Sequence, residues 1–370
     1  MKKRAIVVLM IVLLVAMGLS ACAKNEAEPM PSEEAGAADE AADAEAEGDE
    51  TADAEVEGDV AAEDAGDAGD DASPINVIAL KGPTAMGMVE MMSKAALSSP
   101  EGKAYSFQLL AAPDEVAPLI IQGKADIAAV PANLASVIYN KTEGGVQVLN
   151  INTLGVIYIV EKGETVSSAS DLAGKTIFAS GQGATPEYAL RFILSENGID
   201  PDNDVNIEWK SEHAECLSAL LESEGGVAML PQPFVTAAMA KAEGLRVALD
   251  LTDEWAKTQE GKESPSTLLT GVTIVRKEFA EAHPELVASF MEDYKNSVEY
   301  VNANVEEAAK KIEAFDIVTA AIAEKAIPSC NIVFIDGIEM KVALEGYLSV
   351  LAAQNPQAIG GALPSDDVYR

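Results

Sequence analysis

The sequence predicts an α/β fold of two similar lobes, with mostly parallel sheets, joined by a hinge of two chain crossings. Between residues 75 and 139, short apolar β-type runs alternate with helical segments, and this order is typical of a parallel sheet. The same order recurs about a hundred residues later. Residues 105–133 and residues 205–233 each predict a strand, a helix and a second apolar strand that ends at a proline. A repeated unit of this kind predicts two lobes.

The first copy begins with the apolar run INVIAL at residues 75–80, which predicts a strand. The segment KGPTAMGM then leads into a helix that is expected to reach Leu97. Alternating strands and helices follow. They are expected at 105–110 (strand), 114–122 (helix), 127–130 (strand) and 131–139 (helix).

The second copy contains the stretch IFASGQGATP at residues 177–186, which predicts a strand that turns sharply into a helix. Thr185 is expected to be the N-cap of this helix and Pro186 its first residue. Such a turn points free backbone N–H groups and the positive end of the helix dipole into the space beyond the strand. A ligand site and an ordinary strand-to-helix connection both fit this stretch taken alone.

Two apolar segments are expected to cross between the lobes. Residues 146–160 are too long for one strand and contain Gly155, and residues 271–275 lead back after the second copy. The predicted lobes are residues 75–158 with 273–370, and residues 159–272. Parallel strands would then end at the crevice between the lobes, where ligands of such sheets bind.

The chain after Val275 has a helical pattern. Apolar residues recur on one stripe of the segment 284–300, and three further helices are expected at 305–315, 318–327 and 338–351. We expect these helices to wrap the first lobe, and the final segment GALPSDDVYR to be ordered against it.

Residues 1–22 have the features of a targeting segment. A basic start at residues 2–4 precedes an apolar run at residues 6–18 that is too short for a stable membrane span. The segment ends in LSAC, which resembles the lipobox of bacterial lipoproteins. The resemblance implies cleavage before Cys22 and lipidation of its thiol; an ordinary secretory signal is the alternative. We expect an extracytoplasmic protein that is lipid-anchored to the cell membrane of a bacterium and touches the membrane through this anchor only.

Residues 23–73 predict a disordered acidic tether. Residues 24–73 carry 20 acidic residues against the single Lys24, with almost no large apolar side chain. An acidic interaction tail is the alternative. The tether accounts for −19 of the total charge of −36 and the targeting segment for +3, so residues 74–370 carry −20. Such an acidic domain is a poor candidate for binding nucleic acid.

Beyond Cys22, the chain has only Cys216 and Cys330. We expect two separate buried thiols, because the predicted fold places them in different lobes, where a bond would lock the lobes together. His213 and Cys216 share a helix face and could ligate zinc, yet no second pair of ligands is visible. His213 is therefore expected to be a surface residue among acidic neighbours.

Catalytic motifs are missing from the sequence. It has no GxSxG elbow and no P-loop lysine motif. The carboxylates of Asp253 and Glu254 precede Trp255 at a predicted helix start, where capping explains them. We expect no enzyme activity, no cofactor and no metal site.

By sequence the chain resembles the solute-binding proteins of ABC importers with the type 2 periplasmic-binding fold, in the group that serves nitrate, sulfonates, taurine and thiamine-precursor pyrimidines. The resemblance covers nearly all of residues 75–370. It is carried by SASDLAGKTIFASGQGATPEYALRFIL, by the segment from LLTGVTIVRKEF through YVNANVEEAAKKI, and by the ending LPSDDVY.

This resemblance implies ligand contacts in the loops that follow four strands. Pro131 and Pro231 fit helix starts as well as contacts, and four polar residues have more to offer a ligand: Thr84, Asn133, Thr185 and Gln232. The full set of implied contacts is Gly82, Pro83, Thr84, Met86, Pro131, Ala132, Asn133, Gly181, Gln182, Gly183, Ala184, Thr185, Pro231 and Gln232.

These loops contain no arginine and only Lys81 nearby, which disfavours a strongly anionic solute. We therefore expect a neutral or weakly charged heterocycle such as a pyrimidine, with sulfonate and nitrate as alternatives. The expected protein is a monomer that passes this small-molecule solute to an ABC permease. A surface sensor of the same fold and an enzyme of the thiamine-pyrimidine or menaquinone type are the competing functions.

Overall fold

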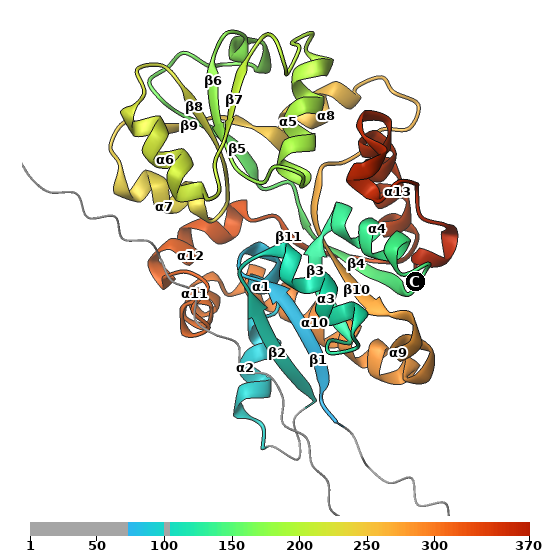
Figure 1. The fold of residues 1–370 in the computed structure, drawn as a ribbon. Coiled ribbons are helices and arrows are strands. Elements are labelled where there is room, and N and C mark those ends of the chain that lie inside the picture. Colours follow the sequence, from blue (N-terminus) through green and yellow to red (C-terminus); the bar gives the residue numbers. More distant parts are fainter. Residues whose placement is uncertain (1–72, 100–103) are drawn as a thin grey trace, which may run out of the picture. The chain divides into compact units, whose positions relative to one another are not determined.

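Two β-sheets with helices packed against them make up the part of the chain that the computed structural model describes, residues 73–99 and 104–370 (Figure 1). These residues all fall within one compact unit, Gly69–Arg370. The predicted targeting segment, Cys22 and nearly all of the acidic tether lie outside the described residues. The predictions about anchoring and disorder therefore stay predictions.

The first sheet has six strands in the order β11-β4-β10-β3-β1-β2. Strand β1 pairs in parallel with β2 and β3, while β10 pairs antiparallel with β3 and β4. We call this sheet and the helices packed on it the first lobe. Its strands are β1 (Ile75–Leu80), β2 (Tyr105–Leu110), β3 (Ile127–Pro131), β4 (Val146–Leu154), β10 (Leu269–Arg276) and β11 (Ile332–Ile335).

The second sheet has five strands in the order β7-β6-β8-β5-β9. Strand β6 pairs in parallel with β7 and β8, and β5 pairs antiparallel with β8 and β9. This sheet with its helices is the second lobe. Its strands are β5 (Ile157–Lys162), β6 (Thr176–Ala179), β7 (Asn206–Trp209), β8 (Val227–Pro231) and β9 (Leu245–Asp250).

The two sheets repeat one plan. In each, three parallel strands in the same spatial order are followed by an antiparallel strand that has just crossed from the other lobe, β10 in the first and β5 in the second. This confirms the predicted α/β fold of two similar lobes joined by two crossings. The sheets are mixed and not mostly parallel as expected, because the crossing strands β10 and β5 pair antiparallel with both of their neighbours. The residue limits proposed for the lobes stay a prediction.

Helices cover both sheets, and proline at the first or second position starts three of them, α1, α5 and α10. No described helix is both long enough and apolar enough to cross a membrane. The helices are α1 (Pro83–Met86), α2 (Val89–Leu97), α3 (Val116–Ile121), α4 (Ala132–Lys141), α5 (Thr185–Glu196), α6 (His213–Glu222), α7 (Phe234–Lys241), α8 (Leu251–Gln259), α9 (Lys277–Ala282), α10 (Pro284–Ala303), α11 (Val305–Ala314), α12 (Ala320–Ala326) and α13 (Gly337–Gln354).

One local expectation was confirmed and one was wrong. The helix expected to follow KGPTAMGM and reach Leu97 is α2, and a short helix, α1, precedes it within KGPTAMGM. At Gly87, between α1 and α2, the backbone lies so close to β11 that an added Cβ would lie 3.0 Å from Ile332 Cγ2. The N-cap of α5 is Ala184, and Thr185 is already helical. The Thr185 side chain is used elsewhere, as described below.

Helix α13 joins the two lobes and does not only wrap the first one as expected. It contacts β4 of the first lobe and α5 of the second (Figure 1). Its side chain Tyr347 lies with its ring centroid 5.8 Å from that of Trp255, which in turn lies 4.4 Å from Phe192 on α5. One apolar cluster therefore runs through both lobes along this seam.

The C-terminal segment is ordered against the first lobe, as expected. Tyr369 forms a parallel bridge with Val148 of β4, and the Asp367 carboxylate accepts hydrogen bonds from Tyr139 (2.5 Å) and Lys277 (3.0 Å). One bridge to β4 and these side-chain bonds therefore hold the segment against the first lobe.

Candidate functional site

A cleft of about 600 Å³ lies between the lobes at the carboxyl ends of their parallel strands. This volume suits a small organic molecule. The first lobe supplies the residues that follow β1, β2 and β3, and the second lobe those that follow β6, β7 and β8. The lining residues are Leu80, Lys81, Gly82, Pro83, Thr84, Ala111, Ala112, Pro113, Pro131, Val156, Ile157, Ser180, Gly181, Ala184, Thr185, Pro186, Ser211, Glu212, His213, Ala214, Pro231, Phe234 and Thr270.

Several helices begin at this cleft. Helices α5, α6 and α7 have their first or second residue in its lining, and α4 starts directly after the lining residue Pro131. The N-terminus of a helix carries a partial positive charge and unsatisfied N–H groups. Their convergence favours a ligand that presents hydrogen-bond acceptors.

Eight of the predicted site residues line the cleft, and six do not. The eight, from both lobes, are Gly82, Pro83, Thr84, Pro131, Gly181, Ala184, Thr185 and Pro231. The six outside the lining are Met86, Ala132, Asn133, Gln182, Gly183 and Gln232. The assignment of ligand contacts to any of them stays a prediction.

Burial in the core or hydrogen bonds to other parts of the chain account for five of the six predicted site residues that do not line the cleft. Met86 and Ala132 are fully buried in the core. The Asn133 amide donates to the Ala358 carbonyl (3.2 Å), and the Gln232 side-chain oxygen accepts from the Thr236 hydroxyl (2.8 Å). The backbone N–H of Gly183 donates to the Glu187 carboxylate (2.7 Å) and is not free for a ligand.

Thr185 lines the cleft, but its hydroxyl group forms hydrogen bonds with residues of the first lobe. The Tyr347 hydroxyl of α13 donates to Thr185 Oγ1 at 3.0 Å, and Thr185 is oriented toward Asn133 Oδ1 at 3.4 Å. Both Thr185 and Tyr347 are buried. The start of α5 is therefore held by the seam between the lobes.

His213 is the main correction at the site. It was expected on the surface, but it lines the cleft, with its Nδ1 2.6 Å from Ser180 Oγ and its ring centroid 5.6 Å from that of Phe234. Burial lowers the pKa of the imidazole below its ordinary value, which favours the neutral ring. Ser180 directly follows β6, and His213 begins α6 after the loop that follows β7, so the rule that selected the other loops could have selected them too.

Few charges face the cleft. Lys81 lies in the lining, and its Nζ pairs with the exposed Asp316 at 2.9 Å; Glu212 is the carboxylate of the lining. No arginine lines the cleft. In the described part of the chain, no group of three or more histidine, cysteine or acidic side chains could hold a metal ion.

Both described cysteines are buried free thiols. Burial raises the pKa of Cys216, and it raises the pKa of Cys330 to about 12. Neither thiol is activated as a nucleophile.

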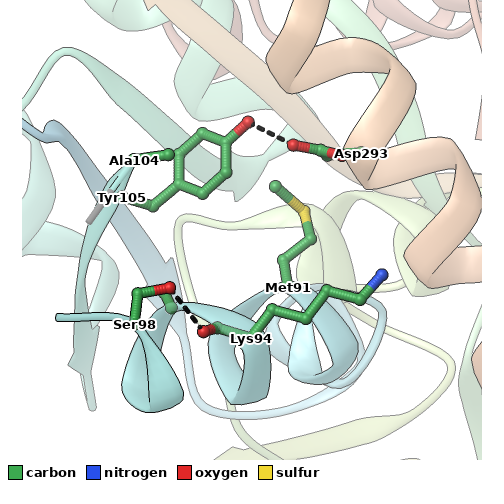
Figure 2. A pocket seen from close by; sticks show the side chains of 7 residues that line it. Met91, Lys94, Ser98, Ala104, Tyr105 and Asp293 are labelled. Atoms are coloured by element: carbon green, nitrogen blue, oxygen red, sulfur yellow. Dashed lines mark hydrogen bonds between the residues drawn. The ribbon is translucent and has the colours of Figure 1, made fainter. Parts of the chain in front are cut away.

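A smaller cavity of about 150 Å³ lies between α2, the start of β2 and α10 (Figure 2). The figure shows the Tyr105 hydroxyl directed at Asp293, to which it donates at 2.6 Å, and the Ser98 hydroxyl bonded to the Lys94 carbonyl. Burial, followed by the hydrogen bond to Asp293, raises the pKa of Tyr105. Because these groups already have partners and the cavity is small, the cleft is the stronger candidate.

A family profile described as NMT1/THI5 like matches residues 108–308, which is more than half of the chain. The chain belongs to the NMT1/THI5-like family. This confirms the family group indicated by the sequence. The matched segment of this NMT1/THI5-like chain runs from β2 to α11 and includes the second-lobe loops that line the cleft. No curated protein sequence matches the chain significantly.

Several solved structures are similar to this NMT1/THI5-like chain. An ABC transporter protein from Parabacteroides distasonis is 21% identical with a TM-score of 0.66, over 80% of this chain and 98% of that one. The periplasmic aliphatic sulphonate-binding protein SsuA from Escherichia coli is 14% identical with a TM-score of 0.63, over 79% and 92%. SsuA from Xanthomonas axonopodis pv. citri, bound to MOPS, is 14% identical with a TM-score of 0.58, over 76% and 93%. At these identities the likeness shows the shared fold.

Proposed function

We propose that the protein captures a small organic solute in the cleft between its lobes and delivers it to an ABC importer. The observation that supports this most directly is the 600 Å³ cleft, whose walls come from the strand ends of both lobes. Its lining has no activated thiol and no metal cluster within the described residues. The protein would act as a binding protein and not as an enzyme.

The composition of the cleft favours a neutral or weakly charged heterocycle, such as a pyrimidine, over sulfonate or nitrate. Proline, alanine and Phe234 provide flat apolar walls, and the single lysine is already paired with Asp316. A strong oxyanion binder would be expected to offer a charged clamp. Helix N-termini and hydroxyl groups could instead hold uncharged acceptors.

The proposed mechanism is closure about the two crossings. Solute would enter between the lobes, contact the loops after β1 and β6, and stabilise the closed form by binding it more tightly than the open form. The predicted lipid on Cys22 would keep the monomeric protein at the outer face of the bacterial membrane, where the closed form meets the permease.

A solute panel tests the proposal. Thermal shift followed by calorimetry would compare pyrimidines, sulfonates, nitrate, flavins and amino acids, and we expect a pyrimidine-type compound to bind most tightly. Ala214→Trp should fill the cleft from α6 and abolish binding, while Ser218→Trp, on an exposed position of the same helix outside the lining, should not. If both variants bound the solute as tightly as the wild type, the cleft would not be the binding site.

A second measurement separates import from sensing. Uptake of the bound solute should fall in cells that lack the protein and recover when it is restored. Tight binding together with unchanged uptake would contradict the role in import and favour a sensor.

A further inference from the structure

Ser180 and His213 form a fixed pair on the second-lobe wall of the cleft. Ser180 directly follows β6 and is 3% exposed, and its Oγ lies 2.6 Å from Nδ1 of His213, the first residue of α6. The ring of Phe234, the first residue of α7, flanks the imidazole. Three neighbouring elements thus set the orientation of one ring.

The distance between Ser180 Oγ and His213 Nδ1 favours the hydroxyl as the donor in this pair. Hydrogen bonds from N–H to oxygen normally span about 2.7–3.2 Å, whereas hydroxyl donors reach shorter distances. Ser180 is therefore taken as the donor to Nδ1 across the 2.6 Å separation. The Cys216 thiol, one turn along α6, is directed at the Glu212 carbonyl and also lies beside the Ser180 hydroxyl. With Ser180 as the donor to Nδ1, the single N–H proton of the neutral ring lies on Nε2.

The Nε2 atom of His213 has no partner among the described residues, although the ring lines the cleft. The neutral state is favoured by burial and by the N-terminus of α6, which disfavours a cation. Neighbouring charges are already engaged. Lys210 pairs with Glu208 (2.9 Å), and the Glu215 carboxylate accepts from the backbone of Ser211 (2.9 Å).

Two charged groups of the lining complete the surroundings of the ring. Glu212 precedes His213, and Lys81 on the opposite wall pairs with Asp316. Neither forms a hydrogen bond or ion pair with the imidazole among the described residues. The Nε2–H group is therefore available to a molecule in the cleft.

We infer that His213 is a specificity-determining residue of the cleft: its Nε2–H donates a hydrogen bond to an acceptor on the solute, and Ser180 is the positioning residue that fixes this tautomer. The solute must then present a carbonyl oxygen, a ring nitrogen or a sulfonate oxygen at the second-lobe wall. A solute that offers only donors there, such as a primary ammonium ion, leaves both groups unpaired and is rejected. This inference rests on the proposed function.

The tautomer can be measured without a solute. The chain has only two histidines, so ¹⁵N-histidine labelling gives two imidazole spectra, and His283→Gln assigns them. We expect His213 to be the Nε2–H tautomer at pH 8 and to titrate below the ordinary histidine pKa. Ser180→Ala should produce a mixture of tautomers. An Nδ1–H tautomer in the wild type, or an unchanged spectrum in Ser180→Ala, would overturn the inference.

Binding completes the test, with a 4-aminopyrimidine and the alkanesulfonate MOPS as probes. His213→Leu should weaken binding of the tighter probe by about tenfold or more, and Ser180→Ala by a smaller factor, since a lost hydrogen bond costs roughly 1–2 kcal/mol. His213→Gln, which keeps an N–H donor, should recover part of the loss. Equal affinity of wild type and His213→Leu overturns this inference alone, whereas absence of binding by the wild type to these probes and to the full panel overturns the proposed function as well.

Discussion

Replacing Tyr347 by phenylalanine tests whether the seam between the lobes is held by a specific bond. The Tyr347 hydroxyl is fully buried on α13 and donates to Thr185 Oγ1 at 3.0 Å, at the start of α5. The substitution removes one oxygen atom and leaves the ring contact with Trp255 in place. The measured effect therefore reports the hydrogen bond and not a cavity.

The structure indicates how large the effect should be. Without Tyr347, the Thr185 hydroxyl keeps only its long contact of 3.4 Å to Asn133. A buried group that loses its partner costs about 1–3 kcal/mol, and because Thr185 can still donate, we expect a loss of about 1–2 kcal/mol in the free energy of unfolding. Thr185→Val should lower the free energy of unfolding by at least as much, because it leaves the buried Tyr347 hydroxyl without its acceptor.

Urea denaturation of the four members of this double-mutant cycle gives the answer. The double variant should be more stable than the sum of the two single losses implies, since both partners of the bond are gone together. Tyr188→Phe is the matched control, because the Tyr188 hydroxyl, also near the seam, has no hydrogen-bond partner among the described residues; it should cost less than about 0.5 kcal/mol. Strict additivity in the cycle would refute the reasoning.

Three further predictions concern the hinge, a buried carboxylate and the thiols. Gly271→Ala places a Cβ 2.8 Å from Thr84 Cγ2 at the cleft, so it should lower stability by about 1–3 kcal/mol and weaken solute binding, whereas Gly225→Ala, with open space at its Cβ, should do neither. Burial alone would raise the pKa of the Glu161 carboxyl, but hydrogen bonds from Thr165 and Val166 and the charge of Arg246 outweigh burial and hold this pKa below its ordinary value. The ionised carboxylate therefore adds stability above the ordinary pKa, and this stability is lost as the pH falls. In Glu161→Gln, the free energy of unfolding should depend less on pH in the acid range. The buried thiols of Cys216 and Cys330, with raised pKa values, should react with a thiol reagent such as DTNB only after denaturation, and fast reaction of either in the native Cys22→Ser protein would contradict their burial.

The regular elements were largely predictable from the sequence because their signals are local. Strands β1 and β2 have the predicted limits, 75–80 and 105–110, since apolar runs bounded by turn residues define them. The repeat was visible as an order of elements, and the sheets bear it out. The short helix α1 within KGPTAMGM was not predicted as a separate element, because four residues are too few to show a helical period.

The site was predictable as a set of loops but not as a set of side chains. Loops follow from strand order, and eight residues chosen in this way do line the cleft. Side-chain direction at a helix start depends on tertiary partners. Asn133 turns to the Ala358 carbonyl, 225 residues away, and Thr185 is bonded by Tyr347, 162 residues away. His213 could have been selected by the same strand-end rule, since it begins α6 after β7, but its pairing with Ser180, 33 residues earlier, depends on the tertiary structure.

The seam and the cleft share helix α5, so the proposed binding of a solute would be coupled to any movement of the lobes. The loop before α5 contributes Gly181 and Ala184 to the cleft, while the next residue, Thr185, is bonded to α13 of the first lobe. A rotation of the second lobe that left this bond intact would have to pivot close to the start of α5. In the proposed binding mechanism, a solute held by the second lobe near Gly181 and His213 would then gain its additional contacts on closure from the first-lobe loop that carries Lys81.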